Sequence, residues 1–270
     1  MPKTVCAKWA GCGAAAKNKN TDMKTVYIMW LRQIKRYLRS RSRIVGALGQ
    51  PILFLVALGY GLGATFQKAG EGNYFTFLGP GIIGMSIIFT AIFSGIEIIW
   101  DRQFGFLKET LVAPVSRFSI MMGRTLGGAT VATIQGIIVF LIVLIPGFRP
   151  FNWALVPVAI LFMLLVALLF TALGTMIASL LEDMQGFQLI MNFIVMPLFF
   201  LSGALFPLEG LPAALSAITK FDPLTYGIDA FRTLLVNLPV IGIGPDLAVL
   251  ATVTAVFLIL GSYFFSKIQV

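Results

Sequence analysis

Few side chains in this sequence could carry out chemistry. There is no histidine, so the commonest general base and a common metal ligand are both missing. The only cysteines, Cys6 and Cys12, have five residues between them, a spacing that fits no zinc site. The G-x-x-x-x-G-K-[ST] loop that cradles the phosphates of ATP is also missing. We therefore expect no catalytic centre, no metal site and no cofactor bound by this chain.

The composition places the chain in a membrane. The 270 residues are 58% hydrophobic and 11% charged, with a mean hydropathy of +0.93. A soluble domain of this composition could not cover its surface with polar groups, so we predict an all-α integral membrane protein.

The net charge of +9 is concentrated at one end of the chain. Residues 1–43 hold eleven Lys or Arg against Asp22 alone, whereas the rest holds nine basic and ten acidic residues. A local basic segment beside a membrane span is expected to meet anionic lipid headgroups rather than nucleic acid.

Six apolar runs are each close to the roughly 20 residues that a helix needs to cross the hydrocarbon core. With the N-terminus in the cytoplasm, the inner segments hold sixteen basic residues and the outer segments only four. This bias predicts that both termini are cytoplasmic. The predicted spans are residues 44–66, 77–100, 123–145, 153–181, 187–206 and 247–265.

Glu97 is the one acid within a predicted span, about one turn from Trp100. An acid inside a membrane is a functional hypothesis by default, and a proton-coupled transporter would use such a group. Glu97 is also close enough to the cytoplasmic face to be solvated or paired with Arg102. We favour this interfacial interpretation and keep the functional one open.

The N-terminal region divides into two parts. Residues 1–23 are predicted to be a disordered cytoplasmic extension without the apolar core of a signal peptide. Residues 24–43 are predicted to form an amphipathic helix at the membrane surface, with apolar positions recurring at spacings of three and four. This helix either braces a cytoplasmic partner or only anchors the topology. Its aromatic and basic positions include Trp30, Arg32, Lys35, Arg36 and Arg39.

A charged interruption at residues 101–124 separates the second and third spans. Within it, residues 103–112 can form a short helix with Phe104, Leu107 and Leu111 on one side. Pro114 would end this helix, because its ring cannot continue the backbone pattern. The segment either transmits force from a soluble partner or is only a positively charged cytoplasmic loop.

The segment 202–232, after the fifth span, is apolar but is broken by several prolines and glycines. Residues 211–219 and 226–236 can each form a helix too short to cross the bilayer. Such pieces fit a re-entrant or interfacial pair near the outer face, which is tolerable where protein or water covers the backbone.

Two motifs carry a resemblance to a known family. The first is Glu109-Thr-Leu-Val-Ala-Pro-Val-Ser-Arg117, and the second combines Leu201-Ser-Gly, Phe206-Pro, Leu211-Pro, Asp222-Pro-Leu-Thr-Tyr226 and Phe231-Arg232. From residue 24 to the C-terminus, the chain resembles the membrane subunit of bacterial ABC-2 type exporters, the class of the daunorubicin-resistance and nodulation-factor export permeases. Residues 44–270 would then be the six-helix transmembrane domain.

The resemblance implies roles for three sets of residues. The short helix would be a coupling helix that docks on an ATPase subunit, and residues 24–43 would be the connecting helix beside it. The pieces after the fifth span would be paired re-entrant helices that form an outer gate. The coupling set is Phe104, Leu107, Lys108, Glu109, Thr110, Leu111, Pro114 and Arg117; the gate set is Pro207, Pro212, Asp222, Pro223, Tyr226 and Arg232.

The resemblance also implies partners and a cargo. Two copies of a separate ATP-binding protein, which would hold ATP and Mg, would drive a homodimer of this chain in the bacterial plasma membrane. The cargo would be an amphipathic drug, lipid or lipid-linked glycan, with a polysaccharide exporter or an ATP-independent transporter or channel as alternatives. The path would form at the interface of the two copies, between the first, second and fifth spans, past Phe54, Phe89, Phe93, Glu97, Phe199 and Phe200.

Overall fold

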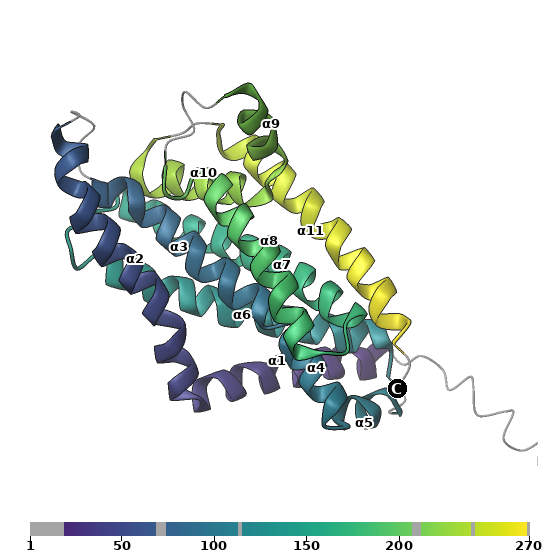
Figure 1. Ribbon diagram of the computed structural model, residues 1–270. Coiled ribbons are helices and arrows are strands. Elements are labelled where there is room, and N and C mark those ends of the chain that lie inside the picture. Colours follow the sequence, from purple (N-terminus) through teal and green to yellow (C-terminus); the bar gives the residue numbers. More distant parts are fainter. Residues whose placement is uncertain (1–18, 69–73, 113–114, 207–211, 239–240, 269–270) are drawn as a thin grey trace, which may run out of the picture.

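The computed structural model describes residues 19–68, 74–112, 115–206, 212–238 and 241–268 (Figure 1). Within these ranges the chain forms helices and connecting turns, without a strand. Six helical segments are long and apolar enough to cross a membrane, which confirms the all-α fold with six spans.

Each predicted apolar run corresponds to a helical span. The fifth helix ends at Leu201, five residues before the predicted end, because residues 202–206 form turns with Gly203 at a φ of +73°. The spans are α2 (Arg41–Lys68), α3 with α4 (Tyr74–Phe93 and Ile96–Gln103), α6 (Arg117–Val143), η3 with α7 (Trp153–Leu155 and Val156–Leu180), α8 (Met184–Leu201) and α11 (Ile243–Ser266).

The second span is broken at Ser94 and Gly95, where the sequence predicted one continuous helix. Two glycines bring the backbones of this span and α7 into contact at the break. A Cβ on Gly95 would lie 2.5 Å from the carbonyl oxygen of Gly174, and a Cβ on Gly174 would lie 2.5 Å from that of Ile92. A larger residue at either position would therefore push the two helices apart.

The buried centre of the bundle consists of α3, α6 and α7, which pack against one another. By contrast, few residues of α2, α8 and α11 are buried, and many of their apolar side chains are exposed. In Figure 1, α2 lies at the left of the bundle and α11 at the right. Such apolar outer faces suit contact with lipid or with another membrane subunit.

The first helix, α1 (Lys19–Arg39), begins five residues before the predicted start and ends before the predicted Arg43. It packs along α6, with Gln33 and Tyr37 buried, while Tyr27 and Leu38 of the predicted apolar stripe are exposed. Ser40 separates α1 from α2, so the chain turns there rather than at residue 43.

The short helices lie at the two ends of the bundle (Figure 1). At the end where α1 lies, α5 (Phe106–Val112) follows α4 after a turn in which Gly105 has a φ of +79°. The predicted helix start at Gln103 is wrong, because this residue still belongs to α4. At the opposite end are α9 (Ala213–Phe221) and α10 (Pro223–Val236). Their position relative to a bilayer stays a prediction.

Candidate functional site

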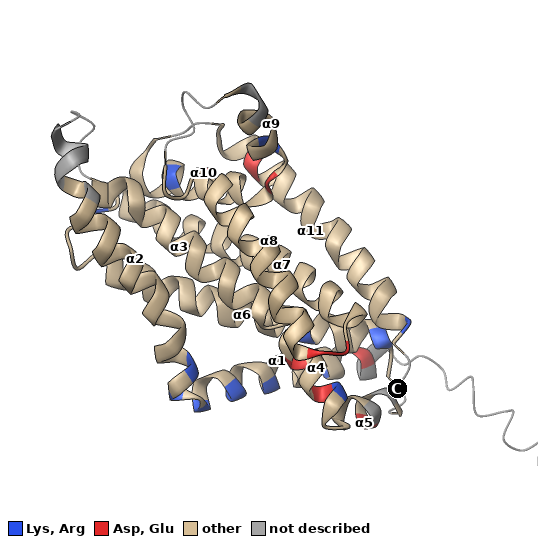
Figure 2. Ribbon diagram, viewed as in Figure 1, with Lys and Arg blue, Asp and Glu red and all other residues tan. Residues whose placement is uncertain are grey.

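Charged residues gather at the end of the bundle where α1, α4 and α5 lie (Figure 2). Within this region, two buried acids of α4 meet arginines from three other helices. We call these residues the ion cluster: Arg32 and Arg36 of α1, Arg43 of α2, Glu97 and Asp101 of α4, and Arg124 of α6.

Asp101 is the centre of the ion cluster. Arg32 donates to both of its carboxylate oxygens, over 3.2 and 3.1 Å, in the forked geometry that makes arginine–carboxylate pairs strong. Arg124 donates to Oδ2 over 2.5 Å and is only 2% exposed. A guanidinium so deeply buried requires a carboxylate partner, because an unpaired charge in that environment is costly.

Glu97 lies one helical turn before Asp101 and is 3% exposed. It accepts hydrogen bonds from Arg36, over 3.5 Å, and from Arg43. The predicted pairing with Arg102 is therefore wrong, and Arg102 instead donates to Glu182 over 2.6 Å. Residues five apart on a helix point about 140° away from each other, so Glu97 and Arg102 do not share a face.

Local helix geometry explains why these groups meet. Glu97 and Asp101 are four residues apart on α4, and Arg32 and Arg36 are four apart on α1, so each pair shares one face. Contacts with α6 fix the rotation of α1. Trp30 donates from Nε1 to Thr130 over 3.0 Å, and the Tyr37 hydroxyl donates to Gln135. Together these two contacts turn the arginines toward α4.

The ion cluster reaches the short helix α5 through Arg32. Its guanidinium carbon lies 3.8 Å from the centre of the ring of Phe106, the first residue of α5. This distance is that of a cation–π contact. One side chain therefore contacts Asp101 in the second span and the start of α5, which sits at the edge of the molecule.

The predicted coupling residues divide between buried and exposed positions. Leu107 is fully buried and fixes α5 to the bundle, whereas Phe104, at 82% exposure, and Glu109 point outward. Thr110 donates back to the carbonyls of Phe106 and Leu107. Arg117 donates to the carbonyl oxygens of Ser266 and Ile268. Pro114 and the side chains of Lys108 and Leu111 lie outside the described part of the structure.

The predicted gate residues form the joint between α9 and α10 at the other end. Asp222 caps α10 by accepting from the amide of Leu224 over 2.9 Å, and Pro223 follows as its first residue. Burial raises the pKa of the Asp222 carboxyl to about 7, although its hydrogen bonds from Leu224 and Thr225 act in the opposite direction. The Tyr226 hydroxyl donates to the carbonyl of Lys220 over 2.8 Å.

Arg232 connects this joint to the end of α8. It donates to the carbonyl of Gly203 over 2.6 Å, and its guanidinium lies 4.1 Å from the ring centre of Phe77. Burial lowers the pKa of Arg232 to about 10, and the nearby Asp229 opposes this change. Pro212 is exposed at the start of α9, and Pro207 lies outside the described residues.

The predicted pathway rings meet where α2, α3 and α8 approach one another. Phe54 packs edge-on against Phe199, with ring centres 6.4 Å apart, and Phe93 packs against Phe187 in the same way. Phe89 stacks on Phe93, and Phe200 is half exposed beside Phe199. Aromatic side chains of the three predicted spans are therefore neighbours within one chain.

Several residues of these sites were not among the predicted site residues. Asp101, Arg124 and the Tyr37–Gln135 pair complete the ion cluster and its support, and Asp229 accepts from the amides of Ile241 and Gly242 before α11. In the sequence, the feature that could have identified these residues was a polar residue inside or beside an apolar run. In the described part of the chain, no three His, Cys, Asp or Glu residues are placed to hold a metal ion.

Comparison with known proteins identifies a matching family and several relatives. Residues 24–236 match the family model of the ABC-2 type transporter. The ycf38 protein of Cyanophora paradoxa, named as a transport permease, is 31% identical over 78% of this chain and 74% of its own length. Nodulation protein J of Rhizobium leguminosarum bv. viciae is 28% identical, over 77% and 81%. The inner membrane transport permease YadH of Escherichia coli K12 is 27% identical, over 76% and 80%.

Proposed function

Because this chain belongs to the ABC-2 type transporter family, we propose that it is the membrane subunit of an ATP-driven exporter. Relatives named as transport permeases support a transporter subunit rather than an enzyme. The six apolar spans agree with a multi-pass protein of the bacterial inner membrane. A separate ATPase chain would supply the energy and bind ATP and Mg, since this sequence has no phosphate-binding loop.

The observation that carries the coupling proposal is the double contact of Arg32. Arg32 bonds to Asp101 in the second span and lies over Phe106 at the start of α5. If the ATPase moves α5, this side chain transmits the displacement to α1 and α4 together. Two arrangements of α5, biased by the nucleotide state of the partner, would then be coupled to two states of the spans.

The proposed assembly contains two copies of this chain and two ATPase subunits. The exposed apolar faces of α2, α8 and α11 leave room for a second membrane subunit, which supports a dimer. Both termini and α5 would lie in the cytoplasm, and α9 with α10 would form the outer gate.

We propose that the cargo is an amphipathic drug, a lipid or a lipid-linked glycan, moved out of the cytoplasm or the inner leaflet. The partly exposed aromatic rings of Phe54, Phe89 and Phe93 support an apolar cargo surface, and the buried ring of Phe199 packs behind Phe54. A polysaccharide exporter of the same family is the closest alternative, and transport measured with a purified polysaccharide would favour it.

An ATP-independent transporter or channel would need another driving force. The buried acid Glu97 was the basis for that alternative, but it is ion-paired with Arg36 and Arg43. Both of its carboxylate oxygens accept hydrogen bonds from arginines, which supports a structural role. Flux through the chain alone in liposomes, without ATPase or nucleotide, would establish this alternative.

The test of the proposed function is purification of the tagged chain from detergent-solubilised membranes, followed by an ATPase assay. We expect an ATP-binding protein in a one-to-one ratio with this chain, and nucleotide hydrolysis by the complex. A stable preparation that contains neither a partner nor ATPase activity, under conditions that preserve other ABC complexes, would contradict the proposal.

The double variant Glu109→Arg, Leu111→Asp tests the role of α5. We expect at least a tenfold loss of ATPase co-purification or of transport-linked hydrolysis, because the variant alters the surface proposed to dock on the partner. The matched control, Lys220→Glu with Ile218→Asp, places a charge reversal and a new carboxylate on exposed positions of α9. Because α9 belongs to the proposed gate, this control is assessed by ATPase co-purification alone, which should be unchanged. Normal ATP hydrolysis and normal ATPase binding in the α5 variant would contradict the assignment of α5 as the coupling helix.

A further inference from the structure

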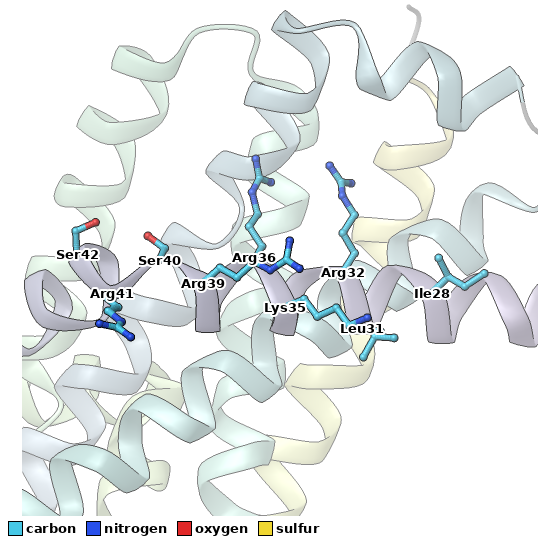
Figure 3. A pocket seen from close by; sticks show the side chains of 9 residues that line it. All are labelled: Ile28, Leu31, Arg32, Lys35, Arg36, Arg39, Ser40, Arg41 and Ser42. Atoms are coloured by element: carbon cyan, nitrogen blue, oxygen red, sulfur yellow. The ribbon is translucent and has the colours of Figure 1, made fainter.

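Two hollows adjoin at the turn between α1 and α2. The first, the cationic hollow, has a volume of about 980 Å³ and is lined by residues between Ile28 and Ser42. Five basic side chains line it. In Figure 3, Arg32 and Arg36 extend from one side of α1 and Lys35 extends from the other, while Arg41 extends from the start of α2.

Only part of this positive charge is balanced. Glu97 and Asp101 pair with Arg32, Arg36, Arg43 and Arg124, so two acids already serve four arginines. Within the described ranges, the remaining basic residues of the hollow, Lys35, Arg39 and Arg41, have no acidic partner. The hollow therefore keeps a positive potential that favours an anion.

The second hollow, the elbow cleft, lies between α2 and α3 and has a volume of about 320 Å³. Tyr37 and Arg43 line the elbow cleft. Arg43 of the cleft and Arg36 of the cationic hollow both donate to Glu97, so the two hollows are neighbours. The other walls of the elbow cleft are mainly apolar or aromatic. They include Pro51, Met85, Phe89 and Phe93.

Ser86 gives the elbow cleft an unused polar group. This residue is 2% exposed, and its hydroxyl has no hydrogen-bond partner in the part of the chain that the structure describes. A helical serine commonly donates to a carbonyl of the preceding turn, as Ser179 does in α7. A buried hydroxyl without a partner is costly, so a ligand that bonds to it would be favoured.

We propose that the elbow cleft and the cationic hollow form one binding site for an anionic amphiphile. The acidic head group lies at the basic side chains, the chain lies between α2 and α3 against Phe89 and Phe93, and a hydroxyl or carbonyl on the chain bonds to Ser86. The site rests on the proposed function in that this amphiphile would be the cargo, taken up from the inner leaflet.

Bromine quenching of a tryptophan measures occupancy of the elbow cleft without ATP. The reporter is Phe89→Trp in the full chain, reconstituted in phosphatidylcholine nanodiscs, and the background signal is that of the unsubstituted chain. The probes are 9,10-dibromostearate and 9,10-dibromostearamide, which share a chain and differ in charge. A second reporter, Phe193→Trp, sits on α8 at a position 81% exposed and corrects for partition into the bilayer.

We expect dibromostearate to quench the Phe89→Trp reporter at a concentration at least threefold lower than the amide. The Phe193→Trp reporter measures partition into the bilayer. There, the concentrations at which the two probes quench should differ by less than threefold. Equal relative quenching at both positions would mean ordinary lipid contact and would overturn the proposal.

Removal of basic residues tests the head-group position. The variant Arg39→Gln, Arg41→Gln should abolish most of the preference for the anionic probe at Phe89→Trp. The matched variant Lys24→Gln, Lys267→Gln removes the same charge from exposed positions outside the lining and should retain the preference. Equal losses in both variants would indicate general electrostatic attraction and contradict a defined site.

Competition with unlabelled acids tests Ser86. We expect 12-hydroxystearate to displace the probe at a lower concentration than stearate, and Ser86→Ala to remove this difference. A difference that persists in Ser86→Ala would exclude the hydroxyl contact.

A further comparison distinguishes a transported amphiphile from a resident membrane lipid. If dibrominated phosphatidylglycerol occupies the elbow cleft but does not alter ATPase activity of the purified complex, the occupant is a resident lipid and the cargo assignment is overturned. If the anionic probe changes ATPase activity and the Arg39→Gln, Arg41→Gln variant weakens this effect, the cargo assignment is supported. Because binding is measured without nucleotide, a missing ATPase partner would contradict the exporter without affecting the binding result.

Discussion

At the scale of single residues, Asp101 is the most consequential side chain in the ion cluster. It is the acidic partner of Arg124, whose Nε and Nη1 atoms have no hydrogen-bond partner within the described residues. Buried ion pairs often add little stability relative to apolar residues, but loss of one partner leaves a charge that water cannot reach. The cluster therefore makes the fold sensitive to changes at one acid.

We predict that Asp101→Ala lowers stability by about 3–5 kcal/mol, the usual effect of leaving a buried charge unpaired. The thermal midpoint in detergent should fall clearly, whereas Glu182→Ala, which removes the exposed partner of Arg102, should change it little. Asp101→Ala with Arg124→Met should recover much of the loss. If the double variant is no more stable than the single one, the unpaired arginine is not the cause.

The pKa of Asp222 predicts a pH dependence of stability. An unfolded aspartate has a pKa near 3.9, whereas burial raises the folded value to about 7. Between these values the folded protein holds a proton that the unfolded chain has released, so stability falls as pH rises from about 4 to about 7 and then levels off.

The variant Asp222→Asn should flatten this slope, since asparagine also caps a helix but does not titrate. Thermal midpoints measured between pH 5 and pH 8 would show the change. Asp183→Asn is the matched control, because Asp183 caps α8 from an exposed position. A slope that is the same in wild type and Asp222→Asn would contradict the prediction.

At the scale of elements, two glycines allow α1 to lie against α6. A Cβ on Gly123 would lie 2.7 Å from the Cβ of Met29, and one on Gly127 would lie 2.6 Å from the Cβ of Gln33. This close approach places the arginines of α1 at α4 and α5. The spacing Gly-xxx-Gly therefore matters here for the connecting helix rather than for a contact between two spans.

We predict that Gly127→Ala loosens α1 from α6, although alanine is the better helix former by about 1 kcal/mol. The readout is maleimide labelling of Met29→Cys in a background with Cys6 and Cys12 replaced by serine. Labelling should be several-fold faster than without the glycine change. Gly49→Ala is the control, because a Cβ at Gly49 meets nothing within 4 Å; equal rates in the two variants would contradict the prediction.

At the scale of the whole molecule, the short helices at the two ends define a direction. The ion cluster and α5 lie at one end, and the joint of α9 with α10 lies at the other (Figure 2). The excess of basic residues at the first end predicts that it is cytoplasmic. Force applied by an ATPase at α5 would therefore enter on the side opposite the proposed gate.

Cysteine labelling tests this orientation. In the same cysteine-free background, Phe221→Cys and Phe104→Cys place thiols at positions 89% and 82% exposed. A membrane-impermeant maleimide should label Phe221→Cys in right-side-out vesicles and Phe104→Cys only after the membrane is opened. The reverse pattern would overturn the predicted topology.

The sequence by itself determined the class of the protein, its six spans and, to within a few residues, the positions of the short helices. Apolar runs of about 20 residues, prolines and the basic bias are local properties, so they are read along the chain without knowledge of packing. The resemblance in two motifs also predicted the family that residues 24–236 match.

Only the tertiary structure decided which charged groups meet. Asp101 pairs with Arg32, which is 69 positions away, and the sequence pattern of either segment contains no information about the other. The break between α3 and α4 likewise depends on a glycine of α7 that lies far along the chain. The physical reason is that helix periodicity fixes which residues share a face, whereas packing fixes which faces come together.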